Sequence, residues 1–195
     1  MDKTLEYYNQ TAHAYAADTL NADVSKLYEF FLSRLPAHAT IMDLGCGPGR
    51  DSLHFLREGY RVQSIDGSPE FCKLASQLTG RPVLCRTFED IDFTEEFDGI
   101  WACASILHVP STRLHLVLEN ISRALKKGGQ LYASFKFGTF EGDRNGRYFT
   151  DMTEETFEKL LAPFNELTII ETMVTGDVRE GREDEKWLNV VVGKG

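Results

Sequence analysis

Three glycines within five residues, Gly45, Gly47 and Gly49, follow an apolar run that contains Asp43. Glycine costs conformational entropy, so such a cluster indicates a backbone that turns tightly or approaches a ligand closely. A second acid, Asp66, ends the next apolar run. A carboxylate in that place can accept hydrogen bonds from both hydroxyls of a ribose. The spacing therefore predicts a ligand that contains a nucleoside.

The residues after the glycines distinguish three ligand classes. A phosphate-binding loop requires a lysine followed by Ser or Thr, but here Arg50 and Asp51 follow. A dinucleotide fold requires G-x-G-x-x-G, whereas this chain has G-x-G-x-G, and Asp51 would place negative charge beside a pyrophosphate. S-Adenosylmethionine carries no phosphate and has a sulfonium cation, which a nearby acid favours. We therefore predict S-adenosylmethionine as the cofactor, with S-adenosylhomocysteine as its product.

Alternating strand and helix patterns must position these residues. Apolar runs bounded by turn residues predict strands, and a 3.6-residue apolar period predicts helices at 4–17 and 23–35 and after the glycines. Ser68-Pro69-Glu70 predicts another helix start, Ser111 a further one, and Asp151 with Glu154 a capping box. The predicted strands are 39–44, 60–66, 82–85, 97–104, 130–137, 167–174 and 186–192.

This alternation predicts an α/β sandwich with a largely parallel sheet and an antiparallel pair at the end of the chain. In such sheets the ligand lies beyond the carboxyl ends of the strands. The glycines and Asp66 both lie at predicted strand ends, so they are expected at one edge of the sheet.

Four stretches together resemble the class I S-adenosylmethionine-dependent methyltransferases: "IMDLGCGPGRDS", "VQSIDGSPEF", "FEDIDFTEEFDGIWACASILHV" and "LKKGGQLYASF". The chain looks most like small stand-alone domains that act on small molecules or metalloid oxyanions, including the tellurite-resistance type. The resemblance implies one domain over 1–195 with a Rossmann-like three-layer fold. Its seven-stranded, mostly parallel sheet would have an antiparallel last strand. The implied reaction is transfer of a methyl group to a small-molecule acceptor by in-line displacement.

The resemblance also implies which residues contact the cofactor. The backbone of the glycine turn would approach the methionine and ribose, Asp66 would hold the ribose, and Phe88 would pack against the adenine. Many relatives have an aspartate after the third strand, whereas this chain has Thr87 there and acids only at Glu89 and Asp90. The full predicted set is Asp43, Gly45, Cys46, Gly47, Gly49, Arg50, Asp66, Gly67, Ser68, Thr87, Phe88, Glu89, Ala102 and Cys103.

Acceptor chemistry is predicted from three further places. His108 follows the fourth strand, where a base could take a proton from the acceptor, although packing under the loop is an equal alternative. The first helix carries two predicted acceptor contacts, Tyr7 and Tyr15. The resemblance implies that residues 1–35 form a helical lid over the site, as the first helix does in similar enzymes. A polar loop at 138–153 carries the remaining predicted acceptor contacts, Arg144, Arg147 and Tyr148, which could bind a carboxylate or an oxyanion.

Composition limits the possible partners. The 195-residue chain has 21 basic and 30 acidic residues, and a formal net charge of -9 repels nucleic acid. Four scattered cysteines without a C-x-x-C pair indicate reduced thiols, and the histidines lack metal-ligand spacing. We expect no metal, no membrane partner, a cytoplasmic location, and a monomer or homodimer.

Two other functions remain open at the level of sequence. One is an S-adenosylmethionine-binding regulatory or interaction domain without catalysis, because binding and turnover are separable. The other is a nicotinamide-dependent oxidoreductase, which the glycine spacing disfavours.

Overall fold

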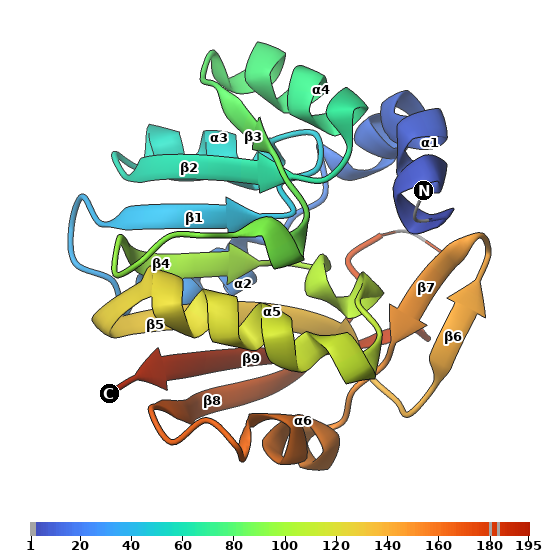
Figure 1. Ribbon diagram of the computed structural model, residues 1–195. Coiled ribbons are helices and arrows are strands. Elements are labelled where there is room, and N and C mark those ends of the chain that lie inside the picture. Colours follow the sequence, from blue (N-terminus) through green and yellow to red (C-terminus); the bar gives the residue numbers. More distant parts are fainter. Residues whose placement is uncertain (1–2, 180, 183) are drawn as a thin grey trace.

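The computed structural model describes residues 3–179, 181–182 and 184–195, and the following account concerns these residues. A seven-stranded sheet has the order β3-β2-β1-β4-β5-β9-β8 (Figure 1). Strand β9 pairs antiparallel with both neighbours, and the pairs from β3 to β5 are parallel. The predicted fold class is confirmed. The strands are β1 Thr40–Leu44, β2 Arg61–Asp66, β3 Val83–Cys85, β4 Phe97–Ala102, β5 Leu125–Lys136, β8 Leu167–Gly176 and β9 Lys186–Lys194.

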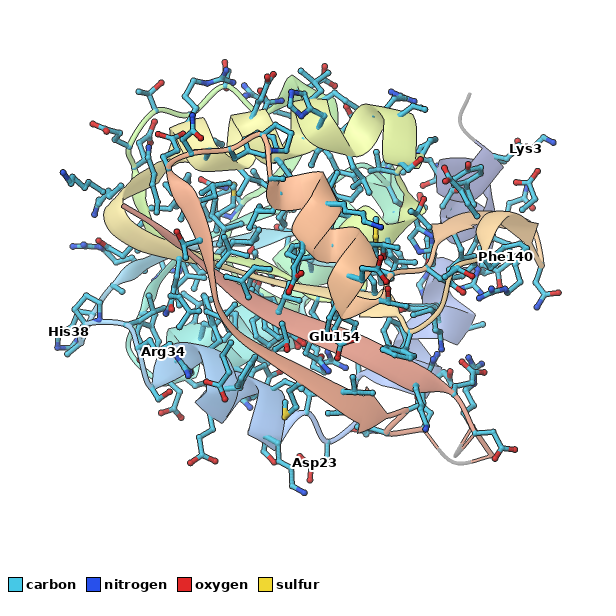
Figure 2. All side chains as sticks on the ribbon, turned by 90° about the horizontal axis from the view of Figure 1, so that it is seen from below. Lys3, Asp23, Arg34, His38, Phe140 and Glu154 are labelled. Carbon is cyan, nitrogen blue, oxygen red and sulfur yellow. The ribbon has the colours of Figure 1, made fainter. Side chains whose placement is uncertain are left out.

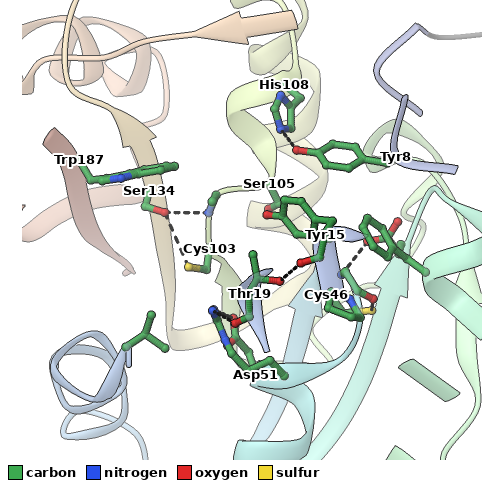
Figure 3. Close-up of a pocket in the computed structure, with 18 of the residues that line it drawn as sticks. Tyr8, Tyr15, Thr19, Cys46, Asp51, Cys103, Ser105, His108, Ser134 and Trp187 are labelled. Atoms are coloured by element: carbon green, nitrogen blue, oxygen red, sulfur yellow. Dashed lines mark hydrogen bonds and ion pairs between the residues drawn. The ribbon is translucent and has the colours of Figure 1, made fainter. Parts of the chain in front are cut away.

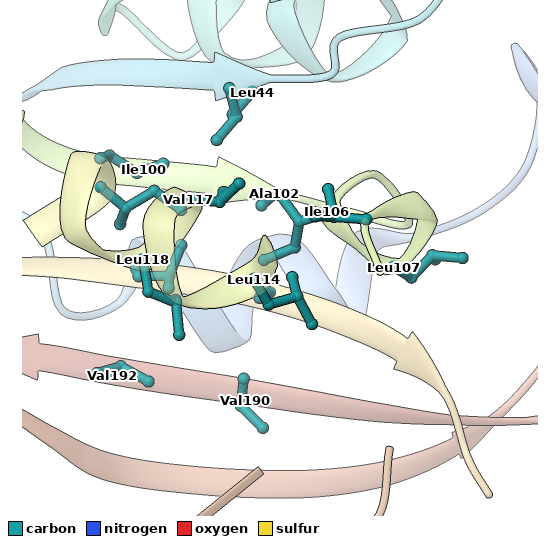
Figure 4. Close-up of a cluster of buried hydrophobic side chains, with 14 of the residues drawn as sticks. Leu44, Ile100, Ala102, Ile106, Leu107, Leu114, Val117, Leu118, Val190 and Val192 are labelled. Atoms are coloured by element: carbon teal, nitrogen blue, oxygen red, sulfur yellow. The ribbon is translucent and has the colours of Figure 1, made fainter. Parts of the chain in front are cut away.

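Helices cover both faces of the sheet because its central strands are apolar on both sides. On one face, Phe31 and Phe55 from the helices α2 and α3 pack on Trp101 and Tyr132 of the sheet. On the other face, α5 and α6 contribute to a larger apolar cluster, in which Leu118 of α5 lies with Val190 of β9 (Figure 4). The helices are α1 Lys3–Thr19, α2 Ser25–Leu32, α3 Arg50–Arg57, α4 Pro69–Thr79, α5 Ser111–Ala124 and α6 Glu154–Leu161, with short 3₁₀ turns at Phe88–Asp90 and Ile106–His108.

The predicted loop at 138–153 contains a hairpin. Strands β6 Glu141–Arg144 and β7 Arg147–Thr150 pair antiparallel around a turn with Asn145 and Gly146, both at positive φ. The hairpin contacts the start of α1, where the Tyr148 amide donates to the Thr4 hydroxyl at 3.0 Å. Figure 2 shows Lys3 and Phe140 at the same end of the molecule, opposite His38. The sequence predicted a polar loop here but not the hairpin within it, because strands of four residues carry too little periodicity to recognise.

The start of α6 also differs from the sequence prediction. The capping box of α6 consists of Thr153 and Thr156, whereas Asp151 accepts a hydrogen bond from Arg144. By contrast, the predicted start of α4 is confirmed, since the Ser68 hydroxyl accepts from the Phe71 amide with proline at the first helical position.

A buried polar network links the helices to the sheet. The Asp51 carboxylate accepts from the Tyr28 hydroxyl at 2.6 Å, from the Trp101 indole at 2.8 Å and from the Arg50 guanidinium at 2.6 Å. Burial opposes the negative charge of Asp51, but Arg50 and these hydrogen bonds lower its pKa. The network therefore holds an ionised carboxylate inside the protein, where the hydroxyl, indole and guanidinium donors compensate its negative charge.

Tyr28→Phe is expected to lower the free energy of unfolding by about 1.5–3 kcal/mol, because it removes one hydrogen bond to a buried charge. Urea unfolding of the variant and the wild type measures this difference. Tyr60→Phe is the control, since the Tyr60 ring packs beside the same apolar cluster and its hydroxyl has no hydrogen-bond partner among the described residues. Equal losses in both variants would contradict the role given to the network.

Candidate functional site

A cavity of about 1040 Å³ lies at the carboxyl ends of the parallel strands. Its wall combines the glycine turn after β1, the end of β2, the turns after β3 and β4, and one face of α1 (Figure 3). Segments that are far apart in the sequence meet here because parallel strands all end at the same edge of the sheet. The volume is at the upper end of the range typical for small-molecule sites.

The three glycines have positive φ angles but different surroundings. A Cβ on Gly45, at φ 78°, would lie 2.4 Å from the Ser105 Cβ. A Cβ on Gly47, at φ 53°, would meet no described atom within 4 Å, and Gly47 lines the cavity. A Cβ on Gly49 would lie 2.9 Å from the backbone of Ala75 in α4. Gly45 and Gly47 therefore shape the cavity, whereas Gly49 permits close packing of two helices.

The Asp66 carboxylate lines the cavity beside the glycine turn. It accepts hydrogen bonds from the amides of Gly47 and Ser68, both at 2.8 Å. Burial raises the pKa of Asp66 to about 6, although these backbone donors oppose the shift. The carboxylate is thus held in one orientation, and its remaining lone pairs are available to ligand hydroxyls.

His108 forms a hydrogen-bonded pair with Tyr8 of α1 (Figure 3). Its Nδ1 lies 2.6 Å from the Tyr148 carbonyl oxygen, which can only accept, so Nδ1 carries a proton. In the neutral form of the ring, Nε2 is left to accept from the Tyr8 hydroxyl, which is 2.7 Å away. Burial raises the pKa of Tyr8 well above its usual range, so this hydroxyl is protonated. Both residues line the cavity.

Most of the predicted cofactor residues meet in this cavity, together with His108 and one of the predicted acceptor contacts. The predicted residues that line it are Gly45, Cys46, Gly47, Arg50, Asp66, Gly67, Thr87, Phe88, Glu89, Cys103, His108 and Tyr15. The predicted residues outside the described lining are Asp43, Gly49, Ser68, Ala102, Tyr7, Arg144, Arg147 and Tyr148.

Three predicted cofactor residues outside the described lining make contacts within the protein. Asp43 accepts from the Ser52 hydroxyl at 2.6 Å, and burial raises its pKa to about 8. Ala102 is fully buried in the apolar core. Ser68 caps α4 and donates to Asn9 of α1.

The three residues of the hairpin that were predicted to contact the acceptor interact with other residues of the protein. Arg144 pairs with Asp151 at 2.8 Å, and the Tyr148 hydroxyl donates to Glu141. Arg147 lies over the Tyr7 ring at 4.9 Å from its centroid. None of these three side chains is part of the described lining. Arg147 nevertheless contacts a residue that is, because its guanidinium donates to the Tyr8 hydroxyl at 3.4 Å.

Sequence reasoning missed several lining residues, among them Tyr8, Ser105 and Trp187. Tyr8 and Tyr15 are seven residues apart and so share one face of the predicted helix, a signal that could have identified Tyr8. Ser105 and Trp187 carried no comparable local signal. Trp187 reaches the cavity because β9 runs antiparallel and therefore starts at the edge where the other strands end.

The residues present fit the predicted cofactor. The unobstructed side of Gly47 lets a ligand approach the backbone, and Asp66 offers acceptor atoms beside it. The Ser105 hydroxyl is buried in the wall and has no hydrogen-bond partner among the described residues. Phe88 supplies an aromatic surface next to Gly45. This combination suits a nucleoside with an uncharged ring and free ribose hydroxyls.

Comparison with known proteins supports one family. Residues 42–133 match the family model described as a methyltransferase domain. Over these residues the chain is similar to the S-adenosylmethionine-dependent methyltransferases. This confirms the resemblance found in the sequence.

Curated relatives are similar over part of this chain. YqeM of Bacillus subtilis, whose name describes a candidate methyltransferase, is 26% identical over 179 residues, covering 85% of this chain and 71% of YqeM. The ubiquinone biosynthesis O-methyltransferase of Xanthomonas axonopodis pv. citri is 33% identical over 114 residues, 54% of this chain. The match spans 47% of that enzyme, so the chain covers about half of its length.

Solved structures share the fold. The 1,6-didemethyltoxoflavin-N1-methyltransferase of Burkholderia thailandensis, bound to 1,6-didemethyltoxoflavin and S-adenosylhomocysteine, superposes with a TM-score of 0.77 at 20% identity. That match covers 97% of this chain and 86% of the other chain. The N-methyltransferase NodS of Bradyrhizobium japonicum, in complex with S-adenosylhomocysteine, superposes with a TM-score of 0.73 at 18% identity. That match covers 95% of this chain and 97% of NodS.

Among the described helices, none is long and apolar enough to cross a membrane.

Proposed function

We propose that this methyltransferase binds S-adenosylmethionine along the glycine turn and methylates a small-molecule acceptor in the same cavity. The observation that carries the proposal is the joint placement of Gly47, Asp66 and the Tyr8–His108 pair around one cavity. The relatives named above include enzymes of small-molecule methylation, which supports the substrate class. When bound, the cofactor supplies a methyl group that is already activated on a sulfonium.

The protein's own residues position the reactants and manage a proton. The Asp66 carboxylate would hold the ribose hydroxyls, and Thr87, Phe88 and Glu89 would border the adenine. His108 would act as the base, with the Tyr148 carbonyl fixing its tautomer. Because the Tyr8 hydroxyl occupies Nε2, the acceptor must either displace this hydroxyl or pass its proton through it.

Helix α1 would act as a lid over the site. Its residues Tyr8 and Tyr15 line the cavity, and its last residue, Thr19, accepts a hydrogen bond from Arg50 through the backbone. Residues 1 and 2 of the predicted lid lie outside the described residues. Opening of α1 would admit ligands, and its closure would exclude water from the transferring methyl group.

Calorimetric titration with S-adenosylhomocysteine, and separately with NADH, tests the cofactor assignment. We expect micromolar binding of S-adenosylhomocysteine and no binding of NADH. Binding of NADH alone, or of neither ligand, would contradict the proposal.

The pH dependence of this binding tests the role of Asp66. Its raised pKa of about 6 means that the carboxyl takes up a proton as the pH falls through that value, and a protonated carboxyl has lost acceptor capacity. The affinity for S-adenosylhomocysteine is therefore expected to fall by up to about tenfold per pH unit below pH 6 and to level off above it. Asp66→Asn should bind more weakly at pH 7.5 and lack this dependence. The same slope in both proteins would assign the titration to another group.

A further inference from the structure

The cavity extends well beyond the glycine turn. Its second half is lined by residues of β5, β9, the end of β8 and the segment after it: Ser134, Asn189, Trp187, Thr175, Gly176, Asp177, Val178 and Arg179. These strands lie on the opposite side of β4 from β1 and β2, which carry the glycine turn and Asp66. If the cofactor occupies the first half, as proposed above, the second half is left for the acceptor.

Trp187 forms a fixed aromatic wall in this half. Its indole N–H donates to the Asp177 carboxylate at 3.0 Å, which prevents the ring from rotating away. The Lys136 ammonium lies over the ring, 4.1 Å from its centroid. Figure 3 shows Trp187 beside Ser134 and Cys103. A ring that is held in this way offers a preformed flat surface, which lowers the entropic cost of binding a flat ligand.

The charged groups around Trp187 compensate one another. Asp177 accepts two hydrogen bonds from the Arg179 guanidinium, at 2.9 and 2.6 Å, and pairs with Lys136 at 3.3 Å. Lys136 also pairs with Glu185, and Arg179 has Asp18 at 3.9 Å. The cluster thus holds two cations and three carboxylates, so it offers little attraction to an anionic acceptor.

The uncharged polar side chains of this half of the cavity also have hydrogen-bond partners within the protein. The Asn189 side chain accepts from the Tyr132 hydroxyl at 2.7 Å and donates to the Met173 carbonyl at 3.0 Å. The Ser134 hydroxyl accepts from the Ala104 amide at 2.8 Å. Recognition in this half therefore depends on ring surfaces and shape more than on hydrogen bonds, because its polar atoms already have protein partners.

We propose that the acceptor is an uncharged, planar aromatic small molecule whose ring stacks against Trp187. The proposal rests on the proposed function, since it assigns the first half of the cavity to the cofactor. It differs from the sequence-based expectation of an oxyanion or carboxylate held by Arg144 and Arg147, neither of which lines the cavity.

Calorimetry with three probes on the protein saturated with S-adenosylhomocysteine tests the acceptor class. The probes are 1-naphthol, trans-1-decalol, which has the same skeleton without aromatic rings, and 1-naphthoate, which is aromatic but charged. We expect 1-naphthol to bind about 3- to 10-fold more tightly than either of the others, the gain expected from aromatic stacking. Equal or tighter binding of trans-1-decalol or 1-naphthoate, or no binding of 1-naphthol, would overturn the proposal.

Variants then locate the aromatic wall. Trp187→Leu should weaken 1-naphthol binding by about 3- to 10-fold, while Trp187→Phe should retain most of it. Affinity for S-adenosylhomocysteine should stay within about twofold in both variants, which also shows that they fold. Phe140→Leu is the matched control, because Phe140 is an exposed aromatic of the hairpin region outside the described lining. Unchanged 1-naphthol affinity in Trp187→Leu would refute the stacking.

The design separates two failures. A wild-type protein that does not bind S-adenosylhomocysteine would refute the proposed function. A wild-type protein that binds S-adenosylhomocysteine but does not prefer 1-naphthol would refute only the acceptor class.

Discussion

His108→Ala is expected to lower the turnover number by about 10²–10⁴, the usual contribution of a general base. The expectation follows from the placement of His108 in the cavity wall, with its protonated Nδ1 tied to the Tyr148 carbonyl and its Nε2 directed at Tyr8. The measurement is the initial rate of S-adenosylhomocysteine formation, with an acceptor found by screening uncharged aromatic alcohols and amines. Affinity for S-adenosylhomocysteine should be unchanged, because the removed imidazole acts on the acceptor.

Tyr8→Phe is the informative partner of this variant. It keeps the ring in the cavity wall but removes the hydroxyl that donates to Nε2 of His108. Loss of turnover similar to that of His108→Ala would show that the acceptor's proton passes through Tyr8. Turnover close to that of the wild type would show that the acceptor meets His108 directly. A fully active His108→Ala protein would remove the base assignment and leave His108 as a packing residue.

Gly45→Ala is the second substitution with a large expected effect. The new Cβ would lie 2.4 Å from the Ser105 Cβ, and the backbone φ of 78° is unfavourable for alanine. Overpacking and the left-handed conformation together should lower the free energy of unfolding by about 2–5 kcal/mol. Because Gly45 and Ser105 both line the cavity, the displacement needed to relieve the overlap should also weaken binding of S-adenosylhomocysteine.

Gly47→Ala provides the matched control. Its φ of 53° is also positive, but its new Cβ would meet no described atom within 4 Å. The stability loss should therefore be only the conformational part, about 1–2 kcal/mol, while affinity for S-adenosylhomocysteine should still fall because the methyl group enters the space of the ligand. Urea unfolding and calorimetry on both variants measure the two effects. Equal stability losses would show that the overlap with Ser105 is relieved without cost.

The sequence by itself determined the sheet and the cofactor end of the site. Apolar runs predicted the strands of the sheet, and the glycine turn and Asp66 predicted where a nucleoside would lie. These features are readable because they depend on local chemistry: positive φ favours glycine, and an acid at the carboxyl end of a strand lies at the ligand edge in any parallel sheet. For the same reason the Ser68 cap of α4 was predicted correctly.

Only the tertiary structure decided the acceptor end. His108 and Tyr8 are 100 residues apart in the chain, so no local pattern could show that their side chains form a hydrogen bond. Arg144 and Arg147 looked suited to bind a ligand, but the pairing of β6 with β7 directs them to Asp151 and to the rings of α1. Trp187 enters the cavity only because β9 inserts antiparallel between β5 and β8. Such contacts depend on how distant elements pack, a property that local residue patterns do not encode.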